Sequence, residues 1–205
     1  MATDQPLGHE LDMRVIAGQY RRRLLRAVPG TDIRPTTDRL RETLFNVLCA
    51  GNPEALAGSV WLDLYAGTGA VGIEALSRGA NMVYFVESSK AATDLIAANL
   101  KSLGIENGFR IIIADALKAV AKIDAGVAAG FAFLDPPYRM QEEYARTLNT
   151  LAGSKLLHES SLVIAEHEKK FDPGDAFRDL RRYRTLAQGD AALSFYRRNL
   201  SGPAA

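Results

Sequence analysis

The chain has 205 residues, of which 47% are hydrophobic, enough for one sizeable domain with a proper core. Its single cysteine, Cys49, excludes an internal disulfide, and its three histidines are too scattered to predict a metal site. No apolar run is long enough for a membrane span, and the first dozen residues lack the basic start and apolar middle of a signal peptide. We therefore expect a cytoplasmic protein, monomeric by default, without membrane contact or bound metal.

The net charge of +1 hides an uneven distribution of arginines. Residues 13–41 contain eight arginines and two aspartates, and residues 178–198 contain six arginines and two aspartates. These segments carry +6 and +4, which leaves −9 on the rest of the chain. Basic ends on an acidic middle favour a polyanionic partner held from two sides. For any single arginine, a solvated position on an exposed face is an equally good interpretation.

In chain order, we expect residues 1–12 to be disordered and residues 13–50 to form a basic extension ahead of a main domain at residues 51–200. Within the extension, residues 13–27 predict two short strands around a turn at Gly18. Residues 33–48 predict a helix, because a Thr-Thr cap candidate precedes apolar residues that recur at helical spacing.

The main domain alternates short apolar runs with helical stretches. Strands are predicted at residues 59–65, 81–87, 109–115, 131–135 and 161–168, helices at 68–80, 88–104, 116–123 and 140–152, and a terminal strand pair at 181–187 and 192–198. Apolar strands separated by helices predict an α/β protein with a mostly parallel, seven-stranded sheet covered on both faces. Ligands bind beyond the carboxyl ends of the strands in such sheets, so the residues that end each strand are the candidates for a site.

The first predicted strand of the main domain ends in DLYAGTGAVG, from Asp63 to Gly72. The glycines Gly67, Gly69 and Gly72 allow a tight turn and a close approach of the backbone to a ligand. A turn of this type holds either a dinucleotide or S-adenosylmethionine, and this motif alone does not distinguish the two.

Acidic residues end the next two strands, Glu87 the second and Asp115 the third. One carboxylate can accept from two ribose hydroxyls, but NAD and S-adenosylmethionine both carry such a ribose. With Asp63 these acids form a negative rim, which favours a cofactor with a sulfonium and an ammonium over one with a pyrophosphate. For each acid taken singly, capping of the following helix is an equally good interpretation.

The fourth predicted strand ends in DPPY, from Asp135 to Tyr138. Its two prolines fix the main chain and remove donors, which leaves carbonyl and carboxylate acceptors in a rigid loop. Such acceptors suit methylation of an exocyclic amine, because they hold its N–H bonds and direct the nitrogen lone pair toward a methyl group. Tyr138 offers a π-face for a base taken out of its stack. The alternative interpretation is a proline turn with a surface aromatic.

In that order, DLYAGTG, Glu87, Asp115 and DPPY resemble the motifs of Rossmann-like class I methyltransferases that modify exocyclic amines. The segments MRVIAGQYRRRLL, RPTTDRLRETLFNVL, GAVGIEALSRGA and QGDAALSFYRR are similar to the RsmD family, and the similarity extends from about Met13 to Arg198. The resemblance implies a Rossmann-like class I methyltransferase fold with a small basic β-hairpin and helix before a methyltransferase domain. It implies S-adenosyl-L-methionine as cofactor and methyl transfer to the N2 amine of one guanine, guanine 966, in 16S rRNA of the bacterial small ribosomal subunit.

The resemblance also implies roles for individual residues. The cofactor's methionine part would be held by Asp63, Ala66, Gly67 and Gly69, its ribose by Glu87 and Ser88, and its adenine by Asp115 and Ala116, with Thr36 and Arg39 closing over the pocket. The guanine would be held by Asp135, Pro136 and Tyr138, where the family often shows Phe in place of this tyrosine. The basic extension would contact RNA through residues that include Arg14, Gly18, Arg21, Arg22, Arg34, Pro35 and Arg41.

Three other functions compete with this one. An amino methyltransferase acting on DNA adenine or on protein glutamine would also use DPPY, but RPTTDRLRETLFN argues against both. An NAD-dependent oxidoreductase would explain the glycine turn and Glu87 but leaves DPPY unexplained. A non-catalytic RNA-binding assembly factor would not need the intact DLYAGTG and DPPY motifs.

Overall fold

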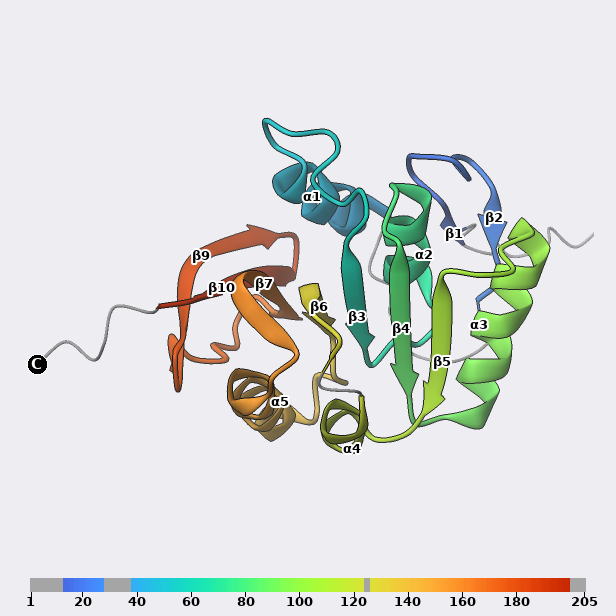
Figure 1. Ribbon diagram of the computed structural model, residues 1–205. Coiled ribbons are helices and arrows are strands. Elements are labelled where there is room, and N and C mark those ends of the chain that lie inside the picture. The colour runs from blue at the N-terminus through green and yellow to red at the C-terminus, as the bar shows by residue number, and fades with distance from the viewer. Residues whose placement is uncertain (1–12, 28–37, 124–125, 200–205) are drawn as a thin grey trace, which may run out of the picture.

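The structure, a computed structural model, describes residues 13–27, 38–123 and 126–199. It contains one sheet with helices on both faces and a separate two-stranded hairpin (Figure 1). The strand order in the sheet is β5-β4-β3-β6-β7-β10-β9-β8. The expected disorder of residues 1–12 and the predicted roles of Arg34, Pro35 and Thr36 lie outside the described residues.

Five apolar strands form the parallel part of the sheet: β3 (Val60–Leu64), β4 (Met82–Glu87), β5 (Phe109–Ile113), β6 (Ala129–Leu134) and β7 (Leu157–Glu168). Each connection from one of these strands to the next contains a helix, as parallel pairing requires. Strand β10 (Ala191–Arg198) pairs antiparallel with β7 on one side and with β9 (Leu180–Gln188) on the other. The predicted mostly parallel α/β fold is confirmed.

The sheet has eight strands, so the predicted number of seven is wrong by one. The additional strand, β8 (Ala176–Phe177), has two residues and pairs with the beginning of β9 at the edge of the sheet. Two residues are too few to show the alternation by which a strand is recognised in a sequence.

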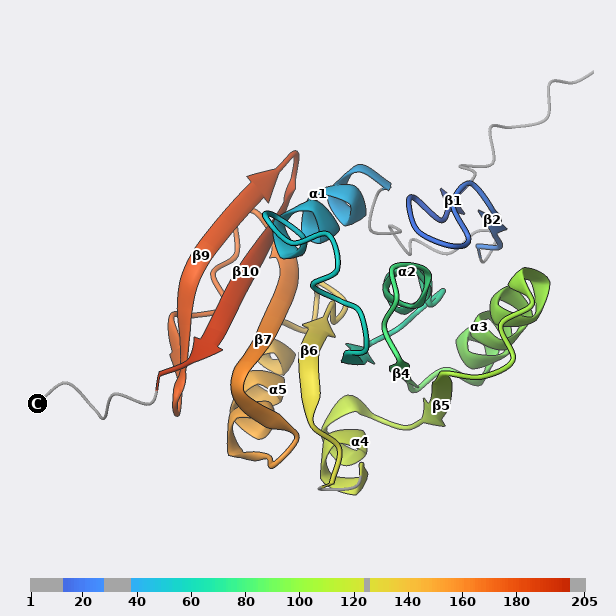
Figure 2. The same cartoon turned by 45° about the horizontal axis from the view of Figure 1, so that its top comes forward.

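Helices cover both faces of the sheet (Figure 2). On one face lie α1 (Asp38–Leu48), α2 (Ala70–Ser77) and α3 (Lys90–Leu103), together with the hairpin strands β1 (Met13–Arg14) and β2 (Leu24–Leu25). On the other face lie α4 (Ala116–Lys122) and α5 (Gln141–Gly153). No helix in the described part of the chain is long and apolar enough to cross a membrane.

The turn of the hairpin is fixed to α2 by hydrogen bonds. The buried carboxylate of Glu74 accepts from the backbone N–H groups of Ile16 (2.7 Å) and Ala17 (3.0 Å). Gly18 has φ +80°, and a Cβ at this position would lie 1.8 Å from the carbonyl oxygen of Ser77. The close approach to α2 therefore requires glycine, and the turn is a fixed part of the fold.

Helix α1 is joined to the sheet by stacked aromatic rings. Phe45 stacks on Trp61 with ring centroids 5.5 Å apart, and Trp61 stacks on Phe131 at 5.2 Å. The apolar side chains of α1 and of the hairpin belong to the same buried cluster as those of β3, β4 and β6. The basic extension and the sheet consequently share one hydrophobic core.

Candidate active site

A cavity of about 840 Å³ lies at the carboxyl ends of β3, β4 and β6. The predicted site residues that line it are Asp63, Ala66, Gly67, Glu87, Ser88, Asp115, Ala116, Asp135, Pro136 and Tyr138. Gly69 lies in the same turn, between the lining residues Thr68 and Ala70. Two motifs that are 68 residues apart in the chain therefore meet at one site.

The glycine turn is shaped by close packing behind it. Gly72 donates its backbone N–H to Asp63 Oδ2 at 2.8 Å. A Cβ on Gly72 would lie 2.4 Å from the Phe85 ring and 2.9 Å from that same carboxylate oxygen. Only glycine brings the first turn of α2 this close to β3 and β4, and this approach fixes the Asp63 side chain at the cavity.

The Asp63 carboxyl group is almost fully buried, with 2% of its surface exposed. Its pKa is raised to about 8, mainly by burial; the Gly72 N–H opposes this shift, and the charge of Glu87 adds to it. A cationic ligand in the cavity would favour the ionised form of this acid, because opposite charges attract strongly where water is excluded.

Glu87 links the glycine turn to the end of β4. Its carboxylate accepts from the backbone N–H of Gly67 at 3.0 Å and from that of Ser89 at 2.7 Å. The Ser88 hydroxyl is 3.4 Å from the same carboxylate. Oxygen lone pairs remain for further donors, since each carboxylate oxygen accepts more than one hydrogen bond.

Asp115 caps a helix and also lines the cavity. Its side chain caps α4 by accepting from the backbone N–H of Leu117 at 3.0 Å and of Lys118 at 3.4 Å. The same residue is exposed and lines the cavity beside Ala116. Helix capping orients a carboxylate that still faces the ligand space.

Asp135 ends β6 beside a second acid on β7. The pairing of Leu134 with Ala165 aligns Asp135 with Glu166 at the carboxyl edge of the sheet. Burial raises the pKa of Asp135 well above its ordinary value, and the charges of Glu166 and Asp63 raise it further. A carboxylate in such surroundings is a better proton acceptor than one in water.

The proline carbonyl next to Asp135 is held from behind by α5. The buried Tyr144 hydroxyl donates to the backbone oxygen of Glu166 at 2.9 Å and approaches the carbonyl of Pro136 at 3.4 Å. Tyr138 follows in the same loop, half-buried and lining the cavity. Asp135, Pro136 and Tyr138 of this loop therefore all line the same cavity.

Tyr65 also lines the cavity, within the glycine motif, although the sequence did not predict a role for it. Its φ of 64° is rare for a bulky residue and costs about 1–2 kcal/mol. The hydroxyl donates to Glu143 Oε2 (3.2 Å) and lies 2.7 Å from Thr147 Oγ1, both on α5. Nothing local in the sequence indicates this contact, because the partners are 78 and 82 residues away.

The predicted RNA-contacting arginines that the structure describes differ in how exposed they are to solvent. Arg21 and Arg22 are exposed on the hairpin turn, and Arg14 is exposed beside Asp38, 3.5 Å away. Arg39 is exposed on the first turn of α1 and is absent from the described residues that line the cavity, so its predicted contact with the cofactor stays a prediction.

The prediction that Arg41 contacts RNA is wrong. Its side chain is fully buried on the inner face of α1, where Nη2 donates to Asp38 at 2.8 Å and to the backbone oxygen of Arg14. Burial lowers the pKa of this guanidinium, and its Nε and Nη1 atoms have no hydrogen-bond partner among the residues that the structure describes. Arg41 joins α1 to the hairpin, and this position is closed to a phosphate.

The described residues contain no group of three side chains that would hold a metal ion. The cavity instead combines a glycine turn, a rim of acids and a rigid loop of acceptors, a set that suits a cationic cofactor beside an amine substrate. The fold and this site together define a class I methyltransferase.

Comparison with known proteins agrees with this class. Residues 13–197 match the model of the family described as conserved hypothetical protein 95. The chain is 36% identical over 190 residues to the "Putative rRNA methyltransferase YlbH" of Bacillus subtilis, covering 91% of this chain and 99% of that protein. It is 33% identical over 192 residues to ribosomal RNA small subunit methyltransferase D of Escherichia coli K12, covering 93% and 92%.

A solved structure, the "Putative methyltransferase yhhF from Escherichia coli", superposes with a TM-score of 0.78 at 29% identity, covering 93% of this chain and 99% of that one. The chain therefore belongs to the RsmD family of S-adenosylmethionine-dependent methyltransferases, and the resemblance drawn from its motifs is confirmed.

Proposed function

We propose that this protein transfers a methyl group from S-adenosylmethionine to the exocyclic N2 amine of a guanine in 16S rRNA, guanine 966 by the family resemblance. The observation that carries the proposal is the meeting of DPPY and the acid-rimmed glycine turn at one cavity of about 840 Å³. We further propose that it acts in the cytoplasm as a monomer on the assembled or assembling small ribosomal subunit. Residues 13–50 would serve as an RNA-contacting extension of a methyltransferase domain at residues 51–200.

The cavity fits the cofactor in charge and shape. Asp63, Glu87 and Asp115 place three carboxyl groups around it, which suits a ligand that carries a sulfonium and an ammonium. Glu87, with Ser88 beside it, would accept from the ribose hydroxyls, and Asp115 and Ala116 would border the adenine. Ala66, Gly67 and Gly69 would leave room for the methionine part against the backbone of the turn. When bound, S-adenosylmethionine supplies an electrophilic methyl group.

The residues of DPPY would activate the amine. The Asp135 carboxylate and the Pro136 carbonyl would accept from its two N–H bonds, so that the nitrogen lone pair is localised and directed at the methyl group. Tyr138 would stack on the guanine. Once nitrogen has gained a fourth bond, one of its protons becomes acidic and passes to Asp135, whose raised pKa favours that transfer.

The proposal is tested by offering the purified protein and labelled S-adenosylmethionine a panel of substrates: naked 16S rRNA, small ribosomal subunits from cells that lack the activity, DNA and bulk protein. We expect label in rRNA, with more label in the particle than in the naked RNA. Label in DNA or protein instead would support the competing amino methyltransferases, and no label in any substrate would contradict the proposal.

A further inference from the structure

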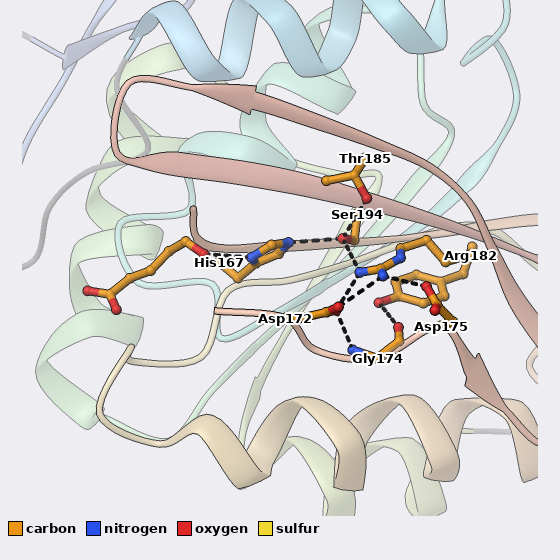
Figure 3. Close-up of polar contacts among 9 residues, drawn as sticks. His167, Asp172, Gly174, Asp175, Arg182, Thr185 and Ser194 are labelled. Atoms are coloured by element: carbon orange, nitrogen blue, oxygen red, sulfur yellow. Dashed lines mark hydrogen bonds and ion pairs between the residues drawn. The ribbon is translucent and has the colours of Figure 1, made fainter. Parts of the chain in front are cut away.

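The arginines of the carboxyl-terminal strands fall into two groups, and the first is occupied by internal contacts. Arg182 donates to both carboxylate oxygens of Asp172, at 2.6 and 3.2 Å, and forms an ion pair with Asp175 (Figure 3). Arg198 pairs with Asp179 at 2.7 Å and donates to two backbone oxygens at the end of α5. These two guanidinium groups stabilise the sheet edge and are not available to a ligand.

The second group consists of Arg184 and Arg197, which are exposed, whereas Arg181 donates to the backbone oxygens of Arg178 and Leu180. Within the described ranges, neither Arg184 nor Arg197 has a carboxylate partner. Tyr183 lies next to Arg184 in β9 with 45% of its surface exposed, a large value for an aromatic residue in a strand. Two arginines without a carboxylate partner beside an exposed ring favour an anionic partner that also has flat rings.

A β-bulge brings these side chains together. The register between β9 and β10 shifts at Phe195 and Tyr196, which pair with Arg184 and Arg182 and leave Tyr183 as the extra residue. As a result, two consecutive side chains lie against the ring of Phe195. The centroid of the Tyr183 ring is 6.3 Å from the centroid of the Phe195 ring, and the Arg184 guanidinium is 6.0 Å from that same centroid. Bulges of this kind redirect side chains toward a common surface.

The guanidinium of Arg197 lies over the Tyr183 ring, 4.3 Å from its centroid. The result is an exposed stack of a ring and a planar cation. Aromatic rings and arginine planes are the surfaces on which proteins stack unpaired bases, while the N–H edges of arginine bind phosphates.

This stack lies on the same face of the sheet as the hairpin and α1. Phe195, on which it rests, belongs to the same buried cluster as Leu44 of α1 and Leu25 of the hairpin. Across the sheet, Arg184 pairs with Phe195, Phe195 with Ile164, and Ile164 with Phe133, two residues before Asp135. Three strand spacings correspond to about 15 Å, the length of a few nucleotides.

We propose that Tyr183, Arg184 and Arg197 form a platform for an unpaired segment of the RNA substrate. A base stacks on the pair formed by Tyr183 and Arg197, while Arg184 binds a phosphate. The proposal rests on the proposed function for the identity of the RNA. An acidic protein partner would satisfy the arginines but would leave the exposed ring and its guanidinium stack without a role.

The test measures binding, without cofactor, of a labelled single-stranded RNA of about 12 nucleotides and of a duplex of the same sequence, at several salt concentrations. Tyr183→Ala should weaken binding of the single strand about tenfold with little effect on the duplex, and Tyr183→Phe should preserve it. Arg184→Gln should reduce the slope of log affinity against log salt by about 0.7, the value for one phosphate contact on a single strand. Thermal unfolding of each variant shows whether the fold is retained.

Arg110→Gln is the matched control, because Arg110 is exposed on β5 at the other end of the sheet and pairs with Tyr84, whose side chain faces α4. Wild-type affinity of Tyr183→Ala for the single strand would overturn the inference. So would a loss of methylation on ribosomal particles without any loss of RNA binding, which would indicate a protein contact. Methylation of a substrate other than rRNA would contradict the proposed function. The platform would then be judged from the RNA-binding measurements alone.

Discussion

Burial controls the protonation of the acids at the carboxyl edge of the sheet. Asp63 and Asp135 both have raised pKa values, mainly because they are withdrawn from water, and each is raised further by a neighbouring acid. The two then differ in what they contact: Asp63 accepts the Gly72 N–H, whereas Asp135 stands at the open end of β6. In the proposed function, the first would bind the cofactor and the second the amine.

Asp135→Ala should lower kcat by about two orders of magnitude, because it removes the acceptor that directs the amine and takes its proton. Cofactor affinity, measured by calorimetry, should change little. Asp94→Ala is a suitable control, since Asp94 is an exposed acid on α3 whose ion pair is with Lys90. An unchanged kcat in Asp135→Ala would remove Asp135 from the mechanism.

Asp63→Asn should alter how stability depends on pH. With a folded-state pKa of about 8 against 3.8 for an aspartate in water, Asp63 holds a proton that the unfolded chain has lost, so the free energy of unfolding falls as pH rises between these values. Asparagine keeps an acceptor for Gly72 and has no proton to lose, so this fall should become smaller by on the order of a few kcal/mol. Urea unfolding at several pH values measures the difference, and parallel curves for the two proteins would contradict the assignment.

The residues that end the strands were predictable because each lies in a short motif whose chemistry is local. Tyr65 and Tyr144 were not, since their partners on α5 and β7 become neighbours only in the folded sheet. Arg41 shows the opposite failure: an arginine in a basic segment suggests solvent exposure, yet its position on the inner face of α1 buries it.

At the scale of elements, the hairpin is attached to α2 by fitted contacts, although β1 and β2 have two residues each. Backbone N–H groups of its turn donate to the side chains of Glu74 and Ser77, and the missing Cβ of Gly18 allows the turn to approach α2 closely. The sequence predicted both the hairpin and the Gly18 turn, because glycine among arginines between short apolar runs is a turn signal. It did not predict that a buried acid on another element would bind the turn.

Gly18→Ala should destabilise the protein by more than about 2 kcal/mol, because it combines left-handed strain with a collision against the Ser77 carbonyl. Gly51→Ala is the matched control: its φ of +78° is nearly the same as the +80° of Gly18, and nothing lies within 4 Å of an added Cβ. It should cost only the strain, about 1 kcal/mol. Equal destabilisation of the two variants in urea unfolding would show that the turn does not depend on its packing against α2.

At the scale of the whole molecule, exposed arginines from both ends of the described chain lie on one face of the sheet. The hairpin that carries Arg21 and Arg22 lies on the same face as α1 and α2 (Figure 2). The Arg184 guanidinium lies over Phe195, whose side chain belongs to the same buried cluster as α1. The charge distribution of the sequence predicted a polyanion held from two sides, but it did not indicate that both groups of arginines lie on the same face of the sheet. That depends on the position of α1, which connects them through the core.

Reversing Arg21 and Arg22 to Glu should weaken association with rRNA and flatten its dependence on salt, by about one unit of slope for each phosphate that is no longer bound. Arg110→Glu makes the same kind of charge change at the far edge of the sheet and should leave the slope unaltered. If the hairpin variant keeps the wild-type slope, these arginines are solvated and the RNA is held elsewhere.

The central claim is that the cavity methylates N2 of a guanine in 16S rRNA, and nucleoside mass spectrometry tests it most directly. Small ribosomal subunits from cells that lack the activity are incubated with the protein and labelled S-adenosylmethionine, and their 16S rRNA is digested and analysed. We predict labelled N2-methylguanosine from a single site, formed about a hundredfold more slowly with Asp135→Ala. Label on any other nucleoside, or on no nucleoside at all, would contradict the claim.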